Sequence, residues 1–210
     1  MNIADAVVFV VDDDTLFRRS MERLLSSVGY PVETFVSAWE FLQREPPTGP
    51  ACLILDVQMP EVNGLALQEL LAGAERLMPI IFLTGYGTVP ISVKALKAGA
   101  ADFLQKPCTD QVLLDTIDRA LLQAQQAWCE HAKQTTVQQY LKTLTTRERE
   151  VLALVVTGML NKQVADALGM ALHQKPFLHR IFRSENRSLW SRKSLQNDAK
   201  KVLLTDGSAY

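Results

Sequence analysis

The stretch VVFVVDD at residues 7–13 is a run of five apolar residues closed by two carboxylates. Three further short apolar runs also end at polar residues, and they read CLILD at residues 52–56, IIFLT at 80–84 and ADFLQKP at 101–107. Short apolar runs of this kind are typical of buried strands in a parallel sheet. Ligand sites of such sheets lie outside the carboxyl ends of the strands, so the sequence predicts one acidic pocket built from all four ends.

Amphipathic stretches alternate with the apolar runs from residue 7 to about residue 122. The pattern predicts a weaker strand at residues 32–35 and helices at 16–28, 37–44, 64–74, 89–98 and 109–123. Five such strand–helix units favour an α/β fold, with a five-stranded, doubly wound parallel sheet covered by helices on both faces.

The rest of the chain has a different pattern. Residues 119–142 contain no Gly or Pro, which predicts that the last helix continues as a long helical linker. Thr145 or Thr146, with a Glu three or four residues later, predicts the start of a further helix. A second short helix is expected from residue 161 until Gly169. Two short helices joined by a tight turn predict a small all-α helix-turn-helix domain.

Composition narrows the class of protein. Hydrophobic residues make up 48% of the 210 residues, and no apolar run approaches the roughly 18 residues that a membrane helix needs. The N-terminus has no signal-peptide pattern, so the expectation is a cytoplasmic protein without a membrane partner. The three cysteines lack CxxC spacing, which argues against a disulfide framework and a zinc site.

The net charge of −1 is unevenly distributed. Residues 1–124 hold 9 Lys and Arg against 16 Asp and Glu, whereas residues 143–210 hold 11 against 6. A basic C-terminal part predicts a polyanionic partner for that part.

The predicted pocket brings together Asp12, Asp13, Asp56, Thr84 and Lys106. Carboxylates without His or Cys form a hard oxygen site, which suits Mg²⁺ or Mn²⁺ better than zinc. A divalent ion also relieves the repulsion among the carboxylates. An Asp beside that ion, with an ammonium and a hydroxyl nearby, is well placed to attack phosphorus.

The ordered set of motifs resembles the receiver domain of two-component response regulators over roughly residues 5–122. The motifs are VDD at residues 11–13, LDVQMP at 55–60, LTG at 83–85 and AGAADFLQKP at 98–107. The resemblance implies that Asp56 is the phospho-acceptor and that Thr84 and Lys106 bind the phosphoryl group. It also implies that Thr84 and Phe103 act as the switch. The implied metal ligands are Asp12, Asp13, Asp56 and the backbone carbonyl of Gln58.

LTTREREVL at residues 144–152 and NKQVADALG at 161–169 resemble the first two helices of the LuxR-type DNA-binding domain. Together with the receiver motifs, they identify the chain as similar to the NarL/FixJ family, in its FixJ-like branch. In that family a third helix enters the major groove of DNA. The expected DNA contacts are Lys162, Gln163, Lys175, His179, Arg180 and Arg183.

The sequence departs from the family pattern after Gly169. MALHQKPFLHR at residues 170–180 lacks the expected Thr-Val-Lys segment, and Pro176 falls in the second turn of the expected helix. A proline inside a helix costs about 3 kcal/mol or more. A rival helix could begin at Pro176 instead. Two explanations stay open: a local reading-frame change that damaged the DNA reader, and a divergent domain that still works.

These observations predict a receiver domain at residues 1–122, a helical linker at 123–142 and a LuxR-type helix-turn-helix domain at 143–210, atypical in its recognition helix and C-terminus. The expected function is a transcriptional regulator, most simply an activator, that is phosphorylated on Asp56 by a sensor histidine kinase. The phosphorylated form is expected to be a homodimer that binds promoter DNA, with RNA polymerase as a candidate partner.

Two alternatives stay open. One is a receiver that acts through protein contacts and has an impaired DNA-binding domain. The other is a phosphatase of the acyl-phosphate type, although the short loops leave no insertion for a substrate cap. On the main hypothesis the protein is not an enzyme, because the receiver catalyses only its own phosphorylation and dephosphorylation.

Overall fold

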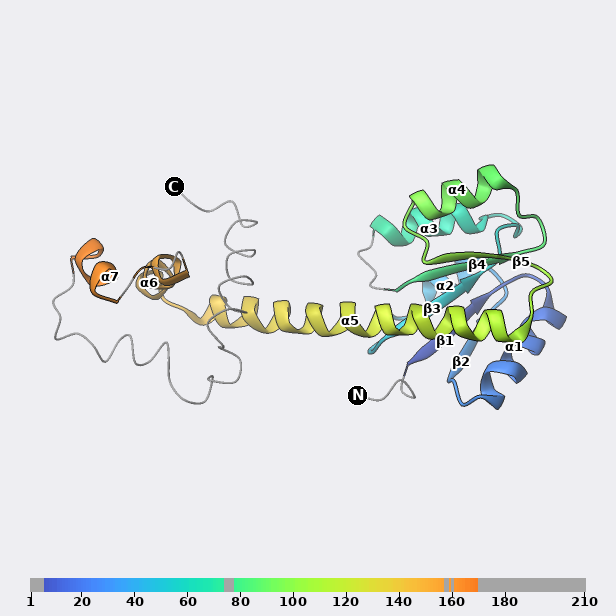
Figure 1. Cartoon of the computed structure of the whole chain (residues 1–210), viewed down its shortest axis with the longest axis horizontal. Coiled ribbons are helices and arrows are strands. Elements are labelled where there is room, and N and C mark those ends of the chain that lie inside the picture. Colours follow the sequence, from blue (N-terminus) through green and yellow to red (C-terminus); the bar gives the residue numbers. More distant parts are fainter. Residues whose placement is uncertain (1–5, 74–77, 157–158, 160, 170–210) are drawn as a thin grey trace. The chain divides into compact units, whose positions relative to one another are not determined.

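The computed structural model of the chain describes residues 6–73, 78–156, 159 and 161–169, and the chain divides into two compact units, Met1–Glu130 and His131–Tyr210. Figure 1 shows the order of the elements along the chain. They are β1 (Val7–Val11), α1 (Thr15–Ser27), β2 (Val32–Phe35), α2 (Ala38–Gln43), β3 (Ala51–Leu55), α3 (Gly64–Gly73), β4 (Ile80–Thr84), α4 (Val89–Lys97), β5 (Asp102–Gln105), α5 (Asp110–Thr143), α6 (Thr146–Val156) and α7 (Asn161–Ala167). Among these residues, no helix is both long and apolar enough to cross a membrane.

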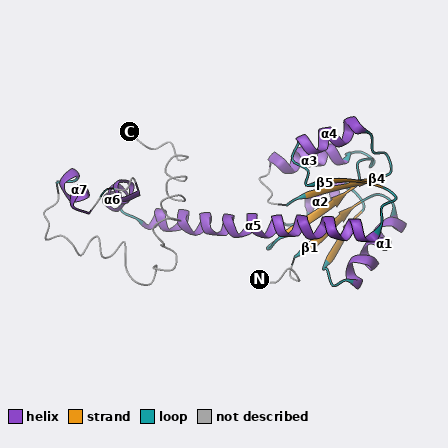
Figure 2. Ribbon diagram, viewed as in Figure 1, coloured by secondary structure: helices purple, strands orange, loops and turns teal. Residues whose placement is uncertain are grey.

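The first unit is built on a five-stranded sheet in the order β2-β1-β3-β4-β5, and every neighbouring pair of strands is parallel. Helices lie on both faces of this sheet (Figure 2). This is the doubly wound α/β fold that the alternating pattern predicts. The strand and helix bounds predicted for this unit are confirmed to within one or two residues, except for the end of α5, which continues into the predicted linker.

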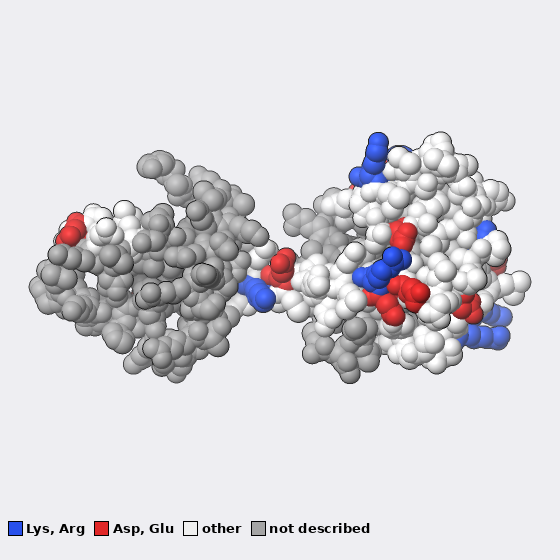
Figure 3. Space-filling view, viewed as in Figure 1, with Lys and Arg blue, Asp and Glu red and all other residues white. Residues whose placement is uncertain are grey.

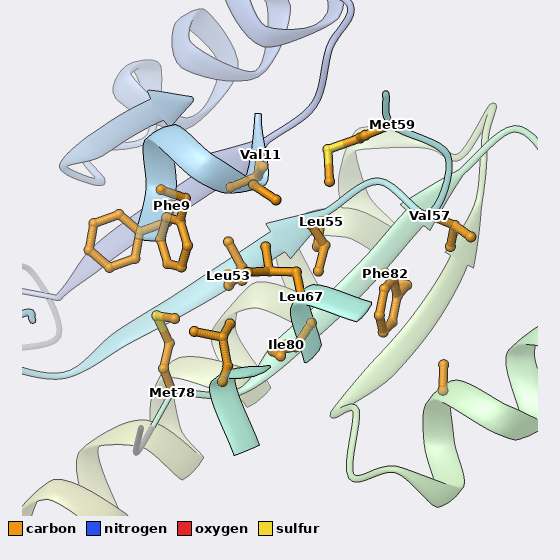
Figure 4. Packing of buried hydrophobic residues seen from close by; sticks show 14 of the residues in the cluster. Phe9, Val11, Leu53, Leu55, Val57, Met59, Leu67, Met78, Ile80 and Phe82 are labelled. Atoms are coloured by element: carbon orange, nitrogen blue, oxygen red, sulfur yellow. The ribbon is translucent and has the colours of Figure 1, made fainter. Parts of the chain in front are cut away.

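The two faces of the sheet follow from the alternation of side chains along each strand. In β1, Phe9 and Val11 point to one face, and Val8 and Val10 point to the other. Figure 4 shows the first face, where strand residues pack with Leu67 of α3. That cluster also contains buried residues of α2 and α4, and the cluster on the second face contains buried residues of α1 and α5.

The helix α5 covers the sheet with its first part and continues beyond the sheet as the linker. The buried side chains of this first part are Leu113, Ile117 and Leu121. On its exposed side, acidic and basic side chains lie side by side (Figure 3). Nη2 of Arg119 lies 3.1 Å from Oδ2 of Asp102. The helix then continues without a break to Thr143, as the composition of the linker predicts.

In the second unit, the predicted start of a helix after Thr145 is confirmed. The backbone N–H and the hydroxyl of Thr145 both donate to Oε2 of Glu148, each at 2.8 Å, and the Glu148 N–H donates back to the Thr145 hydroxyl. This is a capping box, and it satisfies N–H groups that the first turn of α6 leaves without partners. Val151, Leu152 and Val164 are buried, and α6 and α7 are in contact.

Candidate functional site

The carboxyl ends of four strands place the predicted pocket residues at one edge of the sheet. The strand pairing puts Val11 of β1 beside Leu55 of β3, and Thr84 of β4 beside Gln105 of β5. Asp12, Asp56 and Lys106 directly follow three of these strand ends, and Thr84 is itself the last residue of β4. Segments that are far apart in the sequence therefore meet there because the sheet is parallel.

Lys106 provides the positive charge of the site. Its Nζ lies 2.6 Å from Oδ2 of Asp12 and 3.5 Å from Oδ1 of Asp56, and its side chain is 23% exposed. The same ammonium lies 3.6 Å from the centre of the Phe17 ring. The connection after β5 therefore reaches back to the ends of β1 and β3.

Asp56 is 7% exposed, and its carboxylate accepts a hydrogen bond of 2.7 Å from the Gln58 backbone N–H. Burial raises the pKa of the Asp56 carboxyl above its ordinary value, and the nearby Asp12 carboxylate raises it further. The charge of Lys106 and the hydrogen bonds from Gln58 and Thr84 act in the opposite direction. This carboxylate is thus poorly solvated and held in place by donors, which suits a nucleophile.

Thr84 and Phe103 lie on the neighbouring strands β4 and β5. The Thr84 side chain is fully buried; its hydroxyl accepts a hydrogen bond from the Tyr86 N–H, and its carbonyl accepts one from the Lys106 N–H. The half-buried Phe103 ring packs against Phe82, with 6.0 Å between ring centroids. A Cβ added at Gly87 would lie 3.0 Å from Cε1 of Phe103, so the absence of a side chain there makes room for this ring.

The connection from β1 to α1 holds Asp12 in place. Asp12 is 2% exposed, and its Oδ1 accepts the Asp14 N–H at 2.9 Å. The Asp14 side chain caps α1 by accepting the N–H groups of Leu16 and Phe17, as expected of a helix N-cap. Asp13 lies beside Asp12 and is exposed.

Sequence reasoning assigned no site role to three residues that shape the site. Nη1 of Arg18 donates to the Asp12 carbonyl at 2.6 Å, and the Phe17 ring lies beneath Lys106. The third is Gly64, where an added Cβ would lie 2.2 Å from the Asp56 carbonyl oxygen. The sequence did contain signals for these residues. An aromatic residue and a cation lie in the first turn after the two carboxylates, and a glycine lies eight residues after Asp56.

The carboxylates of Asp12 and Asp56 are hard oxygen donors of the kind that Mg²⁺ prefers. Within the described residues, no group of three or more His, Cys, Asp or Glu side chains is arranged to hold a metal ion. The ammonium of Lys106 binds Asp12 Oδ2 instead. The chemistry of these residues therefore fits a magnesium ion. The Lys106 ammonium competes with such an ion for Asp12 Oδ2.

The predicted DNA contacts fall into two groups. Lys162 and Gln163 belong to α7, where Gln163 is exposed. The guanidinium of Arg147 at the start of α6 donates to the Leu168 carbonyl just after α7. This hydrogen bond fixes the end of α7 to the start of α6. The remaining four, Lys175, His179, Arg180 and Arg183, lie outside the described residues, as does Pro176.

Two family models match the chain. The model described as "Response regulator receiver domain" matches residues 8–118, which include the whole pocket. The model described as "Bacterial regulatory proteins, luxR family" matches residues 142–172, which include α6 and α7.

Curated relatives match along most of the chain. Nodulation protein W of Bradyrhizobium diazoefficiens is 45% identical over 166 residues, which are 79% of this chain and 73% of the relative. The transcriptional regulatory protein FixJ of Rhizobium meliloti is 36% identical over 163 residues, which are 78% of this chain and 80% of the relative.

Solved structures give the same result. The response regulator StyR matches with a TM-score of 0.77 at 39% identity, over 93% of this chain and 98% of StyR. Full-length FixJ from B. japonicum matches with a TM-score of 0.56 at 30% identity, over 95% of this chain and 98% of FixJ. The pocket at the strand ends, the two family models and these relatives agree, and the chain therefore belongs to the NarL/FixJ family of two-component response regulators, with a receiver domain and a LuxR-type DNA-binding domain.

Proposed function

We propose that Asp56 accepts a phosphoryl group from a partner sensor histidine kinase and that this modification controls DNA binding by the C-terminal domain. One observation carries the proposal. An almost fully buried carboxylate lies beside the Lys106 ammonium and a buried Thr84 hydroxyl at the ends of adjacent strands. Such an arrangement stabilises the charge of a phosphoryl group during transfer.

The transfer begins when a carboxylate oxygen of Asp56 attacks the phosphorus of a phosphohistidine. A P–O bond forms, the P–N bond breaks, and the imidazole leaves and takes up a proton. The Lys106 ammonium and the Thr84 hydroxyl bind different phosphoryl oxygens. Water later hydrolyses the acyl phosphate to regenerate Asp56 and release phosphate. The receiver then catalyses only its own phosphorylation and dephosphorylation.

The proposed ligands of Mg²⁺ or Mn²⁺ are the carboxylates of Asp12, Asp13 and Asp56 and the backbone carbonyl of Gln58. When bound, the ion neutralises charge on the carboxylates and on the phosphoryl oxygens. Lys106 competes with the ion for Asp12 Oδ2, because its ammonium lies 2.6 Å from that oxygen.

We divide the chain into a receiver domain at residues 1–122, a helical linker at 123–142 and a DNA-binding domain at 143–210. On phosphorylation Thr84 moves toward the phosphoryl oxygen and Phe103 turns inward, and this favours a homodimer that binds promoter DNA. RNA polymerase is the next partner of an activator of this kind. The proposed DNA contacts are Lys162, Gln163, Lys175, His179, Arg180 and Arg183.

The test of phosphorylation uses the full-length chain, Mg²⁺ and a small phosphodonor. Wild-type protein is expected to gain one phosphoryl group on Asp56, measured by intact mass, and Asp56→Asn is expected to gain none. Asp115→Asn, an exposed carboxylate on α5, is the matched control and should react like wild type. Incorporation by Asp56→Asn at the wild-type rate would overturn the assignment.

A second candidate is a receiver that acts through protein contacts without reading DNA. It is favoured by the end of the luxR-family match at residue 172, before Pro176. Titration of phosphorylated, full-length protein with duplex DNA at several salt concentrations separates the two. A DNA reader loses affinity linearly in log K against log salt, and Lys162→Ala lowers that slope by about one if Lys162 contacts a phosphate. Absence of binding at low salt would favour the second candidate.

A further inference from the structure

The ammonium of Lys106 has an aromatic partner as well as its two carboxylates. Its Nζ lies 3.6 Å from the centre of the Phe17 ring, and it also lies 2.6 Å from Asp12 Oδ2. The negative face of an aromatic ring attracts a cation within about 6 Å of the centroid, more strongly where water is partly excluded. With the Lys106 side chain 23% exposed, this contact is partly shielded from water.

Local structure fixes where the Phe17 ring lies. The side chain of Asp14 accepts the Phe17 backbone N–H at 3.2 Å, so the helix cap sets the position of that residue. On the other side of Phe17, Arg18 donates to the Asp12 carbonyl at 2.6 Å. The ring itself packs half-buried against the cluster that contains Met21 and Leu113. Hydrogen bonds of Asp14 and Arg18, residues on either side of Phe17, and packing of the ring therefore fix the position of the ring against Lys106.

We propose that Phe17 is a positioning residue, whose ring keeps the Lys106 ammonium beside Asp56 after Asp12 has turned to the metal ion. This inference rests on the proposed phosphorylation of Asp56. The ring suits the task because it attracts an ammonium without offering an oxygen that competes for the metal. A carboxylate at position 17 would offer such an oxygen, and an aliphatic side chain would give no such attraction.

The main test changes the charge distribution of the ring while keeping its size. Phenylalanine at position 17 is replaced in the full-length chain by its mono-, di- and trifluorinated forms, each of which weakens the negative face further. The rate of Asp56 phosphorylation by phosphoramidate with saturating Mg²⁺ is expected to fall stepwise along the series. The melting temperature is expected to stay constant. Rates that do not change along the series would overturn the proposal.

A second measurement reports on the contact without any phosphorylation. In metal-free protein, the ε-methylene protons of Lys106 are expected to be shifted upfield by the ring current of Phe17. Phe17→Leu should return them to their ordinary position. Phe41→Leu should leave them shifted, because it removes a buried ring of α2 in the cluster on the opposite face of the sheet from Phe17. An unshifted wild-type resonance would contradict the contact itself.

A double-mutant cycle links the ring to the lysine. Phe17→Leu is expected to slow phosphorylation roughly three- to tenfold, the range of a partly desolvated cation–π contact. In a Lys106→Met background the same substitution should have no further effect, because the cation is already gone. An equal loss in both backgrounds would reduce Phe17 to a packing residue.

The outcomes also separate this inference from the proposed function. If wild-type protein is not phosphorylated on Asp56, the proposed function fails. If Asp56 is phosphorylated but neither the fluorinated series nor the cycle shows an effect, only the role of Phe17 fails.

Discussion

Lys106 and Asp12, which are 94 residues apart in the sequence, form an ion pair of 2.6 Å at the carboxyl edge of the sheet. Asp12 is 2% exposed, so this pair satisfies a carboxylate that has little access to water. The pair also means that the site carries its own cation next to an oxygen proposed to bind magnesium.

Replacement of Lys106 by Met is expected to tighten Mg²⁺ binding, because the competing ammonium is removed and the carboxylates lose their internal counterion. At partly buried sites an effect of about threefold or more is expected from the Coulomb energy. Phosphorylation should nevertheless slow. Isothermal titration calorimetry measures the dissociation constant, and Lys97→Met, an exposed lysine of α4, is the control. Weaker Mg²⁺ binding by Lys106→Met would contradict the competition.

The raised pKa of Asp56 predicts a pH-dependent effect of Asp56→Asn on stability. A carboxyl whose pKa is higher in the folded state stabilises the fold at low pH, and this contribution is lost as the pH rises through the folded value. At pH 7 without Mg²⁺ the buried charge therefore opposes folding, and Asp56→Asn should melt at a higher temperature than wild type. The difference should shrink as the pH falls below the folded pKa.

Thermal unfolding between pH 4 and pH 8 measures this effect, with Asp115→Asn as the exposed control. Added Mg²⁺ should raise the melting temperature of wild type more than that of Asp56→Asn. A lower melting temperature for Asp56→Asn at pH 7 would show that Lys106 outweighs the cost of burial.

Gly64 is required by a close approach of the backbone. An added Cβ would lie 2.2 Å from the Asp56 carbonyl oxygen, a separation that forces the backbone to move. Gly64→Ala is therefore expected to destabilise the protein by about 2 kcal/mol or more, and to slow phosphorylation by displacing Asp56. Gly49→Ala is the control, because nothing lies within 4 Å of a Cβ there. Urea unfolding of both variants measures the difference, and equal stabilities would refute the clash.

Gln68 of α3 is 3% exposed, and its Nε2 donates to the Ala95 carbonyl of α4 at 3.1 Å. Among the described residues its Oε1 has no hydrogen-bond partner, and the Ala95 carbonyl also accepts the Ala100 N–H. Gln68→Met removes the unsatisfied oxygen, and the Ala95 carbonyl still accepts the Ala100 N–H. The free energy of unfolding of this variant should therefore lie within about 1 kcal/mol of the wild-type value or exceed it.

Gln68→Glu keeps the shape of the side chain but places a carboxylate against that carbonyl, and it should destabilise the protein by about 3 kcal/mol at pH 7. Chemical denaturation of the two variants gives the comparison. If Gln68→Met loses more than Gln68→Glu, the hydrogen bond to Ala95 matters more than the unsatisfied oxygen.

The sequence by itself determined the α/β architecture and the edge of the sheet where the pocket lies. Apolar runs of four or five residues and their alternation with amphipathic stretches are local properties, and a parallel sheet then brings the strand ends together. Asp12, Asp56, Thr84 and Lys106 could be assigned to one pocket for that reason. The helix cap at Thr145 was also predictable, because it is local: the Thr145 hydroxyl accepts the N–H of a residue only three positions later.

Only the tertiary structure decided how these groups are paired. Lys106 lies closer to Asp12 than to Asp56, and the Phe17 ring lies against the Lys106 ammonium. Asp12 is buried, whereas Asp13 is exposed. All of these relationships depend on how helices and loops pack on the sheet. The approach of Gly64 to Asp56 is of the same kind. Side chains on different elements meet at distances set by close packing across the sheet, and no local pattern of residues encodes those distances.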